Sequence, residues 1–136
     1  APKSLDRAKD RIRELTRRNR GVAFEVMVGR LNSFLTGWVT YYRFAKCKTA
    51  LTELDGWIRH RLRCVRLKQR KRRYAIATFL VQLGLPTWRA WPLAWSGKGW
   101  WRKAGSPQAA EAMTIKWFEE LGLVNLVRRY AALQTP

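Results

Sequence analysis

Acidic residues are scarce in this sequence, and their scarcity limits the chemistry that it can support. The 136 residues include 28 Lys and Arg but only nine Asp and Glu, which gives a formal net charge of +19. Polymerase and nuclease sites hold metal ions with clustered carboxylates, but the three Asp are Asp6, Asp10 and Asp55, and no acidic pair stands at the end of a strand. Glu119 and Glu120 are adjacent, and adjacent side chains point apart on a helix. We therefore expect no metal, cofactor or catalytic residue in this chain, and hence no enzyme.

Cysteine and histidine are also rare. Cys47 and Cys64 do not form a CxxC motif, and His60 is the single histidine, so neither a zinc site nor a nucleophile–base pair is expected. Two lone thiols are typical of a reducing compartment, which favours a cytoplasmic location. His60 lies within a basic segment, where we interpret it as a phosphate neighbour or a helix-filling residue and not as a general base.

Long apolar runs are missing as well. None approaches the ~20 residues of a membrane span, and the charged N-terminal segment does not resemble a signal peptide. We therefore expect no membrane partner. The apolar fraction of 47% is nevertheless ample for a hydrophobic core, so the chain is predicted to fold and not to be a disordered basic tail.

The excess positive charge gathers in residues 59–73, RHRLRCVRLKQRKRR, which contain nine Lys or Arg and no acidic residue. Read as a helix, this segment places Arg59, Arg63, Arg66, Arg70 and Arg73 on one face, beside a separate apolar face. Such a row repels itself, whereas a polyphosphate would neutralise it, and the guanidinium fork suits phosphate. We therefore predict a phosphate-tracking ridge. The residues predicted to bind nucleic acid are Arg59, Arg61, Arg63, Arg66, Lys68, Arg70, Lys71, Arg72, Arg73 and Arg43.

The apolar spacing predicts an all-α fold, because strand-like alternation is absent. Three long helices are expected over residues 4–20, 23–45 and 49–70, with a break between Lys68 and Arg73 and a fourth helix over 74–83. Ser4 is the expected N-cap of the first helix. The long helices should form a bundle. Its expected core contains Leu15, Leu31, Leu35, Trp38, Leu54, Ile58 and Leu62.

The sequence changes character after Pro86, where five Trp fall within residues 88–101 among Pro and Gly. No period persists there, so we expect mostly loop with packed indoles, of which one or two at most are exposed. Trp100 and Trp101 are the candidates for stacking on bases. Ser106 and Pro107 predict the start of short helices that end the chain. The expected domains are residues 1–84 and a small C-terminal region, 85–136.

Three segments, LNSFLTGWVTYYRF (31–44), LTELDGWIRHRLRCVRLKQRKRR (51–73) and LGL (83–85), resemble the maturase-specific domain of group II intron reverse transcriptases. WWRKAGSPQAAEAMTIKWFEELGL (100–123) resembles the segment that follows in many bacterial members. Leu67 stands where many members have Trp. The resemblance is carried by Leu31, Asn32, Gly37, Trp38, Tyr41 and Tyr42, and then by Leu54, Asp55, Trp57, Ile58 and Arg59.

The resemblance implies that residues 1–84 are a thumb, or X, domain that clamps template–primer duplex and holds structured group II intron RNA in its splicing-competent fold. Residues 85–136 would be the region implicated in binding target DNA. Palm and fingers with a YxDD motif, which use Mg²⁺, would lie upstream of residue 1 and contact this chain. The chain would then be a C-terminal fragment of an RNA-directed DNA polymerase.

The residues leave a competing interpretation open. The basic row could instead dock onto an acidic surface of a polymerase core or another protein, which would make the chain a structural module. A helix lying on a membrane surface is a more distant alternative, because the apolar face beside the arginine row has the width that a bundle core needs.

Overall fold

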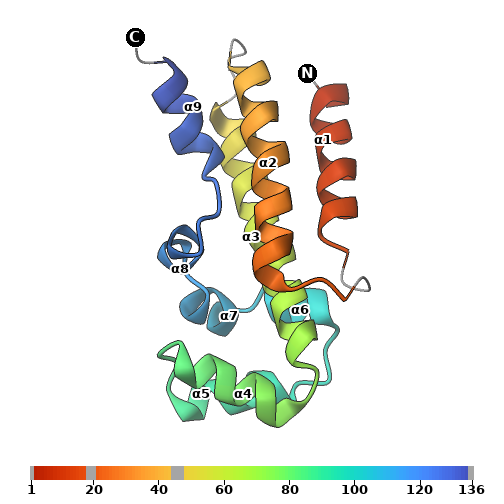
Figure 1. Cartoon of the computed structure of the whole chain (residues 1–136). Helices are drawn as coiled ribbons and strands as arrows, with labels where there is room; N and C mark the ends of the chain where they lie inside the picture. Colours follow the sequence, from red (N-terminus) through yellow and green to blue (C-terminus); the bar gives the residue numbers. More distant parts are fainter. Residues whose placement is uncertain (1, 18–20, 44–47, 135–136) are drawn as a thin grey trace. The chain divides into compact units, whose positions relative to one another are not determined.

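The computed structural model describes residues 2–17, 21–43 and 48–134. These residues form helices and no strand (Figure 1), which confirms the predicted all-α class. In chain order the helices are α1 (Pro2–Leu15), α2 (Phe24–Tyr42), α3 (Lys48–Arg70), α4 (Arg73–Gln82), α5 (Thr87–Trp95), α6 (Trp100–Ala104), α7 (Pro107–Ala112), α8 (Ile115–Glu120) and α9 (Leu126–Gln134).

The chain divides into two compact units. Unit 1 comprises Ala1–Ile58 together with Glu119–Pro136, and unit 2 comprises Arg59–Phe118. The expected boundary after residue 84 concerns domains of the family, and it stays a prediction. The compact units follow a different division, because the C-terminal segment belongs to the same unit as α1 and α2.

Unit 1 is built around α2, which packs against α1 and α9 (Figure 1). Apolar side chains recur every three or four residues along α2, so they line a continuous stripe. Burial of each such side chain contributes about 1.5–3 kcal/mol. The buried residues of α2 are Phe24, Met27, Val28, Leu31, Leu35, Val39 and Tyr42.

The predicted core is confirmed at five of its seven positions, which are Leu31, Leu35, Leu54, Ile58 and Leu62. It is wrong at Leu15 and Trp38, which are only half-buried. Leu15 is the last residue of α1. Trp38 lies flat against Tyr42, with ring centroids 4.7 Å apart and planes at 15°, so one face of its indole packs on a neighbour.

The first helix is shorter than expected. It begins at Pro2 and ends at Leu15, so Ser4 lies inside the helix and is not its N-cap. Proline is well suited to the first position of a helix because its missing N–H would be unpaired there. Residues 18–20 of the expected helix, and residues 44–45 of the second, lie outside the described residues.

Unit 2 begins within α3, which ends at Arg70. Lys71 has a φ of 64°, a left-handed conformation that interrupts the helix, and α4 begins at Arg73. The predicted break between Lys68 and Arg73 is therefore confirmed. Beyond it, α4 packs against α5, and α7 contacts α4, α5 and α6. Fully buried side chains of this unit include Leu67, Ile76, Leu80, Met113 and Phe118.

The structure of the tryptophan-rich segment, residues 88–101, differs from the sequence prediction. The segment forms α5 and α6 where mostly loop was expected. Trp88, Trp95 and Trp101 are 73%, 58% and 44% exposed, whereas one or two exposed indoles were expected, and Trp91 and Trp100 are half-buried. The buried residues of α5 are instead the small side chains Ala90 and Ala94 together with Leu93.

The short helices that follow were predicted well. The Ser106 hydroxyl accepts a hydrogen bond from Ala109 N at 3.2 Å, and Pro107 opens α7, as the Ser-Pro pair indicated. Thr114 caps α8 in the same way, accepting from Trp117 N at 3.0 Å. Gly122 follows α8 with a φ of 89°, a conformation that favours glycine.

Candidate nucleic-acid interface

Positive charge is concentrated in unit 2. Residues 59–118 contain fourteen Lys and Arg and a single acidic residue, Glu111, so their formal net charge is +13. Glu111 is itself paired with Arg89. Repulsion among so many like charges opposes folding of the unit. The contacts of its arginines show how part of that repulsion is offset.

The charged side chain of Arg63 also packs against other residues of unit 2. Its Nε donates a hydrogen bond to the carbonyl of Met113 at 2.9 Å, and its guanidinium lies 5.4 Å from the ring centroid of Phe118. Burial, and to a lesser extent the neighbouring charge of Arg59, lower the pKa of Arg63 to about 10. Because this pKa lies well above neutral pH, the guanidinium stays charged and interacts with the aromatic ring as a cation.

Arg66 and Arg70 share one aromatic partner. Their guanidinium carbons lie 5.2 and 4.6 Å from the ring centroid of Phe79, which projects from α4. Phe79 in turn meets the edge of Trp117, with centroids 6.3 Å apart. The sequence placed Arg63 and Arg66 away from the apolar face, and that interpretation is wrong. A long stem and a planar head let arginine cover aromatic surface that a shorter side chain would leave open.

The predicted single ridge of five arginines is also wrong at its end. Arg73 lies on α4, beyond the left-handed Lys71, so it does not continue the face of α3. Its guanidinium lies 4.4 Å from the ring centroid of Trp95. Lys71, Arg72 and Arg73 are the exposed members of the predicted set, whereas Arg59, Arg61 and Lys68 are half-buried. The cations most open to a ligand therefore flank the turn between α3 and α4.

Arg43 belongs to unit 1. Its guanidinium donates to the carbonyl of Thr40 at 2.5 Å, and its own carbonyl accepts a hydrogen bond from the side chain of Gln134. A basic side chain that binds the last carbonyls of a helix stabilises its C-terminal end. These contacts give Arg43 a structural role at the end of α2, and its role in binding nucleic acid stays a prediction.

His60 and Trp101 form a stacked pair, with ring centroids 3.5 Å apart and planes at 15°. His60 Nε2 also donates to the carbonyl of Trp101 at 2.8 Å. Trp100 is half-buried beneath Lys103, whose Nζ lies 4.8 Å from the indole centroid. Burial, and then the positive charge of Arg73, lower the pKa of Lys103. Both expected stacking residues thus already have partners within the unit.

Sequence reasoning missed the more exposed aromatic side chains, Tyr74, Trp88 and Trp95, which are 72%, 73% and 58% exposed. A signal was present, because Trp88, Trp91 and Trp95 are spaced by three and four residues and so share one face of a helix. The Pro and Gly residues around them concealed that spacing.

Metal ligands are not gathered in the described residues, which hold no group of three or more His, Cys, Asp or Glu side chains. Cys64 is a buried thiol, and Cys47 lies outside the described residues. Across the same described ranges, none of the helices has both the length and the apolar character to cross a membrane.

Comparison with known families finds a match over more than half of the chain. The family model of the group II intron maturase-specific domain matches residues 5–80. The chain therefore belongs to the group II intron maturase-specific domain family, which links it to the splicing of group II introns. No curated protein matches the chain.

Proposed function

We propose that this chain is a non-catalytic nucleic-acid-binding part of a group II intron maturase, which binds intron RNA and promotes its splicing. One observation carries the proposal. A member of the maturase-specific family has a compact unit with a net charge of +13, in which Lys71, Arg72 and Arg73 are exposed beside one turn. A phosphate backbone is the ligand that such a surface attracts most strongly.

The arginines divide into two roles. Arg63 packs on Phe118, and Arg66 and Arg70 pack on Phe79, so these three arginines stabilise the fold of unit 2. The exposed cations at the turn between α3 and α4 contact phosphates. A protein that binds the folded intron more tightly than its unfolded forms stabilises the folded RNA by mass action. No reacting group on the protein is needed for this kind of assistance to splicing.

The same chemistry extends to the finer functions that the family resemblance implies. Template–primer duplex and target DNA also present rows of phosphates, so the exposed cations of unit 2 can contact them without reading sequence. In a reverse transcriptase, the palm and fingers would hold the Mg²⁺ ions and the reacting strand. This chain would hold the duplex.

The salt dependence of intron RNA binding tests the proposal. Changing Lys71→Gln and Arg72→Gln together should lower the slope of log affinity against log salt by about 1 to 2, because each lost phosphate contact removes roughly 0.7–0.9. The matched control is Arg7→Gln with Arg129→Gln, which removes two exposed charges from unit 1 and should change the slope less.

Two outcomes would contradict the proposal. Equal slopes for the two double variants would mean that the turn between α3 and α4 is not the site of contact. Competition by heparin as effective as that by intron RNA at raised salt would mean that unit 2 binds any polyanion, which favours docking on an acidic protein surface.

A further inference from the structure

Helix α5 buries small side chains and exposes large aromatic ones, which is the opposite of what folding alone favours. It buries Ala90 and Ala94 with Leu93 and leaves Trp88 and Trp95 mostly exposed. Burial of an indole removes far more apolar surface from water than burial of an alanine methyl group. Folding alone would favour the opposite orientation, so the exposed indoles indicate a partner that covers them.

The three tryptophans of α5 form one row, which we call the tryptophan face (Trp88, Trp91 and Trp95). Their spacing of three and four residues places them on one side of the helix. At the rise of an α-helix the row is roughly 10 Å long, which corresponds to about three bases at the ~3.4 Å spacing of a stacked strand. Tyr74 adds an exposed ring beside it, 6.1 Å from the centroid of Trp91.

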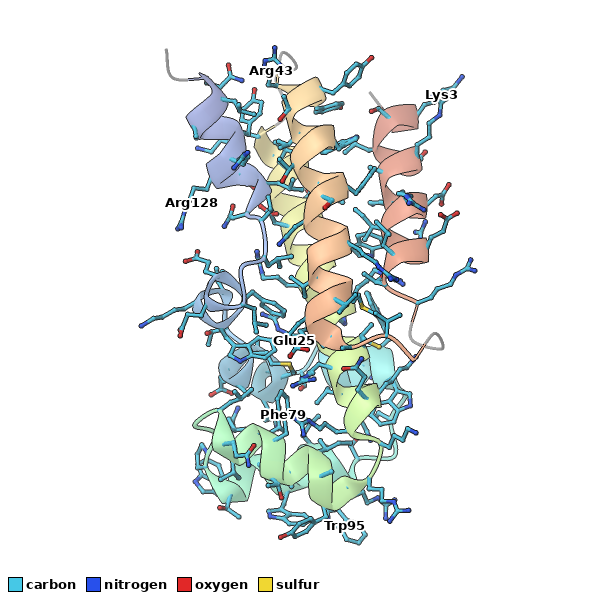
Figure 2. All side chains as sticks on the ribbon, viewed as in Figure 1. Lys3, Glu25, Arg43, Phe79, Trp95 and Arg128 are labelled. Carbon is cyan, nitrogen blue, oxygen red and sulfur yellow. The ribbon has the colours of Figure 1, made fainter. Side chains whose placement is uncertain are left out.

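Positive charge adjoins the tryptophan face. Arg73 lies over Trp95, and Arg72 and Lys71 precede it as exposed cations. Figure 2 shows Trp95 and Phe79 on opposite sides of the paired helices α4 and α5, so the arginines that lie over Phe79 do not cover Trp95. A further cation, Arg89, lies over Trp88, with its guanidinium carbon 5.7 Å from the ring centroid. An aromatic row next to phosphate-binding cations matches the chemistry of a polynucleotide strand, which offers flat bases on one side and phosphates on the other.

We propose that the tryptophan face, with Tyr74, is a stacking platform for two or three unpaired nucleotides whose phosphates are held by Arg73 and the cations before it. The proposal deepens the proposed function, on which it rests, by naming unpaired nucleotides as the ligand of this surface. Duplex regions cannot use the platform, because their bases are already stacked on one another. The platform therefore distinguishes loops, bulges and single strands from helical nucleic acid.

The composition of the exposed surface favours a strand over a membrane. The large apolar side chains exposed in unit 2 are Tyr74, Val81, Trp88, Trp95, Trp101 and Ile115. Four of these six are aromatic and none is Leu or Phe, whereas the apolar face of a helix that lies in a membrane surface combines Trp with Leu and Phe side chains that enter the acyl boundary. Flat rings beside guanidinium groups suit stacking on bases better than insertion into lipid.

Paired substitutions of the two exposed indoles test the platform. In the full chain, Trp88→Leu with Trp95→Leu keeps apolar surface but removes the flat rings, while Trp88→Phe with Trp95→Phe keeps a ring at both positions. Each lost stack should weaken binding of a twelve-nucleotide single-stranded RNA by about fivefold to a hundredfold. The Phe pair should lose less, and binding of a twelve-base-pair RNA duplex should change less than twofold in both.

Tyr41→Leu supplies the matched control, because Tyr41 is an aromatic side chain of unit 1 that is 81% exposed. It should leave single-strand binding unchanged. The circular dichroism spectrum and thermal midpoint of each variant should match those of the parent chain, since the replaced indoles are exposed.

The outcomes separate this proposal from the proposed function. Equal losses for single strand and duplex in the Leu pair would overturn the platform and leave phosphate binding intact. Unchanged single-strand binding would overturn it as well. Failure of the parent chain to bind either RNA would overturn both proposals. Tighter binding of the parent to phosphatidylserine vesicles than to single-stranded RNA, lost in the Leu pair, would assign the tryptophan face to a membrane surface.

Discussion

The carboxylate of Asp55 holds the start of a helix that begins 71 residues later, at Leu126. Its Oδ1 accepts a hydrogen bond from the backbone N–H of Leu126 at 2.9 Å, and its Oδ2 accepts one from Val127 at 3.1 Å. Asp55 is only 5% exposed. A negative charge at the N-terminal end of α9 pairs N–H groups that the helix leaves free and also complements the helix dipole.

Asn32 binds the same C-terminal segment from another helix. Its Nδ2 donates to the carbonyl of Gly122 at 2.7 Å, and its Oδ1 accepts from Val124 N at 2.8 Å. Asn32 and Asp55 are two of the polar residues by which the sequence resembles the maturase-specific family. In unit 1 both fasten residues 122–127, which lie beyond the part of the chain that the family model matches. Their role is therefore structural, and it ties the C-terminal segment to α2 and α3.

Replacement of Asp55 should destabilise unit 1. Asp55→Ala leaves the buried N–H of Leu126 and its neighbour without a partner, and we expect a loss of about 1–3 kcal/mol in the free energy of unfolding. Asp55→Asn keeps one acceptor oxygen and should lose less. Urea denaturation followed by circular dichroism measures both, with Asp10→Ala on the exposed side of α1 as control. A loss no larger than that of the control would show that α9 does not depend on this carboxylate.

Periodic segments were predictable, and their boundaries less so. The stripe of α2 and the break after Arg70 follow from apolar spacing and from the lack of apolar support near Lys71, and both are present. The ends of α1 were misplaced because residues 16–20 carry no signal strong enough to stop a helix before Gly21. Caps made by remote residues, such as Asp55 for α9, cannot be read from local sequence at all.

The site was only partly predictable, because a segment's composition does not say which of its faces is buried. Eight tryptophans suggested a core, yet α5, which packs against α4, buries two alanines and leaves Trp88 and Trp95 mostly exposed. The basic row on α3 suggested a surface, yet Phe79 and Phe118 cover much of it. Both errors have one cause, since aromatic and arginine side chains are amphipathic and their tertiary partners decide the side they face.

Arg63 should contribute to stability where Lys71 does not. Arg63→Gln removes the hydrogen bond to Met113 and the contact with Phe118, so we expect a loss of about 1–3 kcal/mol. Lys71→Gln removes the same charge from an exposed side chain and should change stability by less than about 0.5 kcal/mol. Chemical denaturation of the two variants gives the comparison. Equal midpoints would mean that Arg63 is a surface charge after all, as the sequence first indicated.

The lowered pKa of Lys103 predicts an unusually reactive amine that depends on Arg73. Burial and the positive charge of Arg73 both disfavour the ammonium form, so at pH 8.5 a larger fraction of Lys103 is neutral than of an ordinary lysine. Arg73→Gln removes the second cause and raises the pKa, which should slow acylation of Lys103. Mass spectrometry after brief treatment with acetic anhydride measures the rate, with Lys98 in the same digest as internal reference.

The matched variant for this test is Arg72→Gln, which removes another exposed charge one residue away. Because Arg73 is the positive group that acts on Lys103 and Arg72 is not, only Arg73→Gln should slow the reaction. Equal slowing in both variants would attribute the effect to the total charge of unit 2. No slowing in either would show that burial alone lowers the pKa, and Arg73 would then be free to serve a phosphate without altering its neighbour.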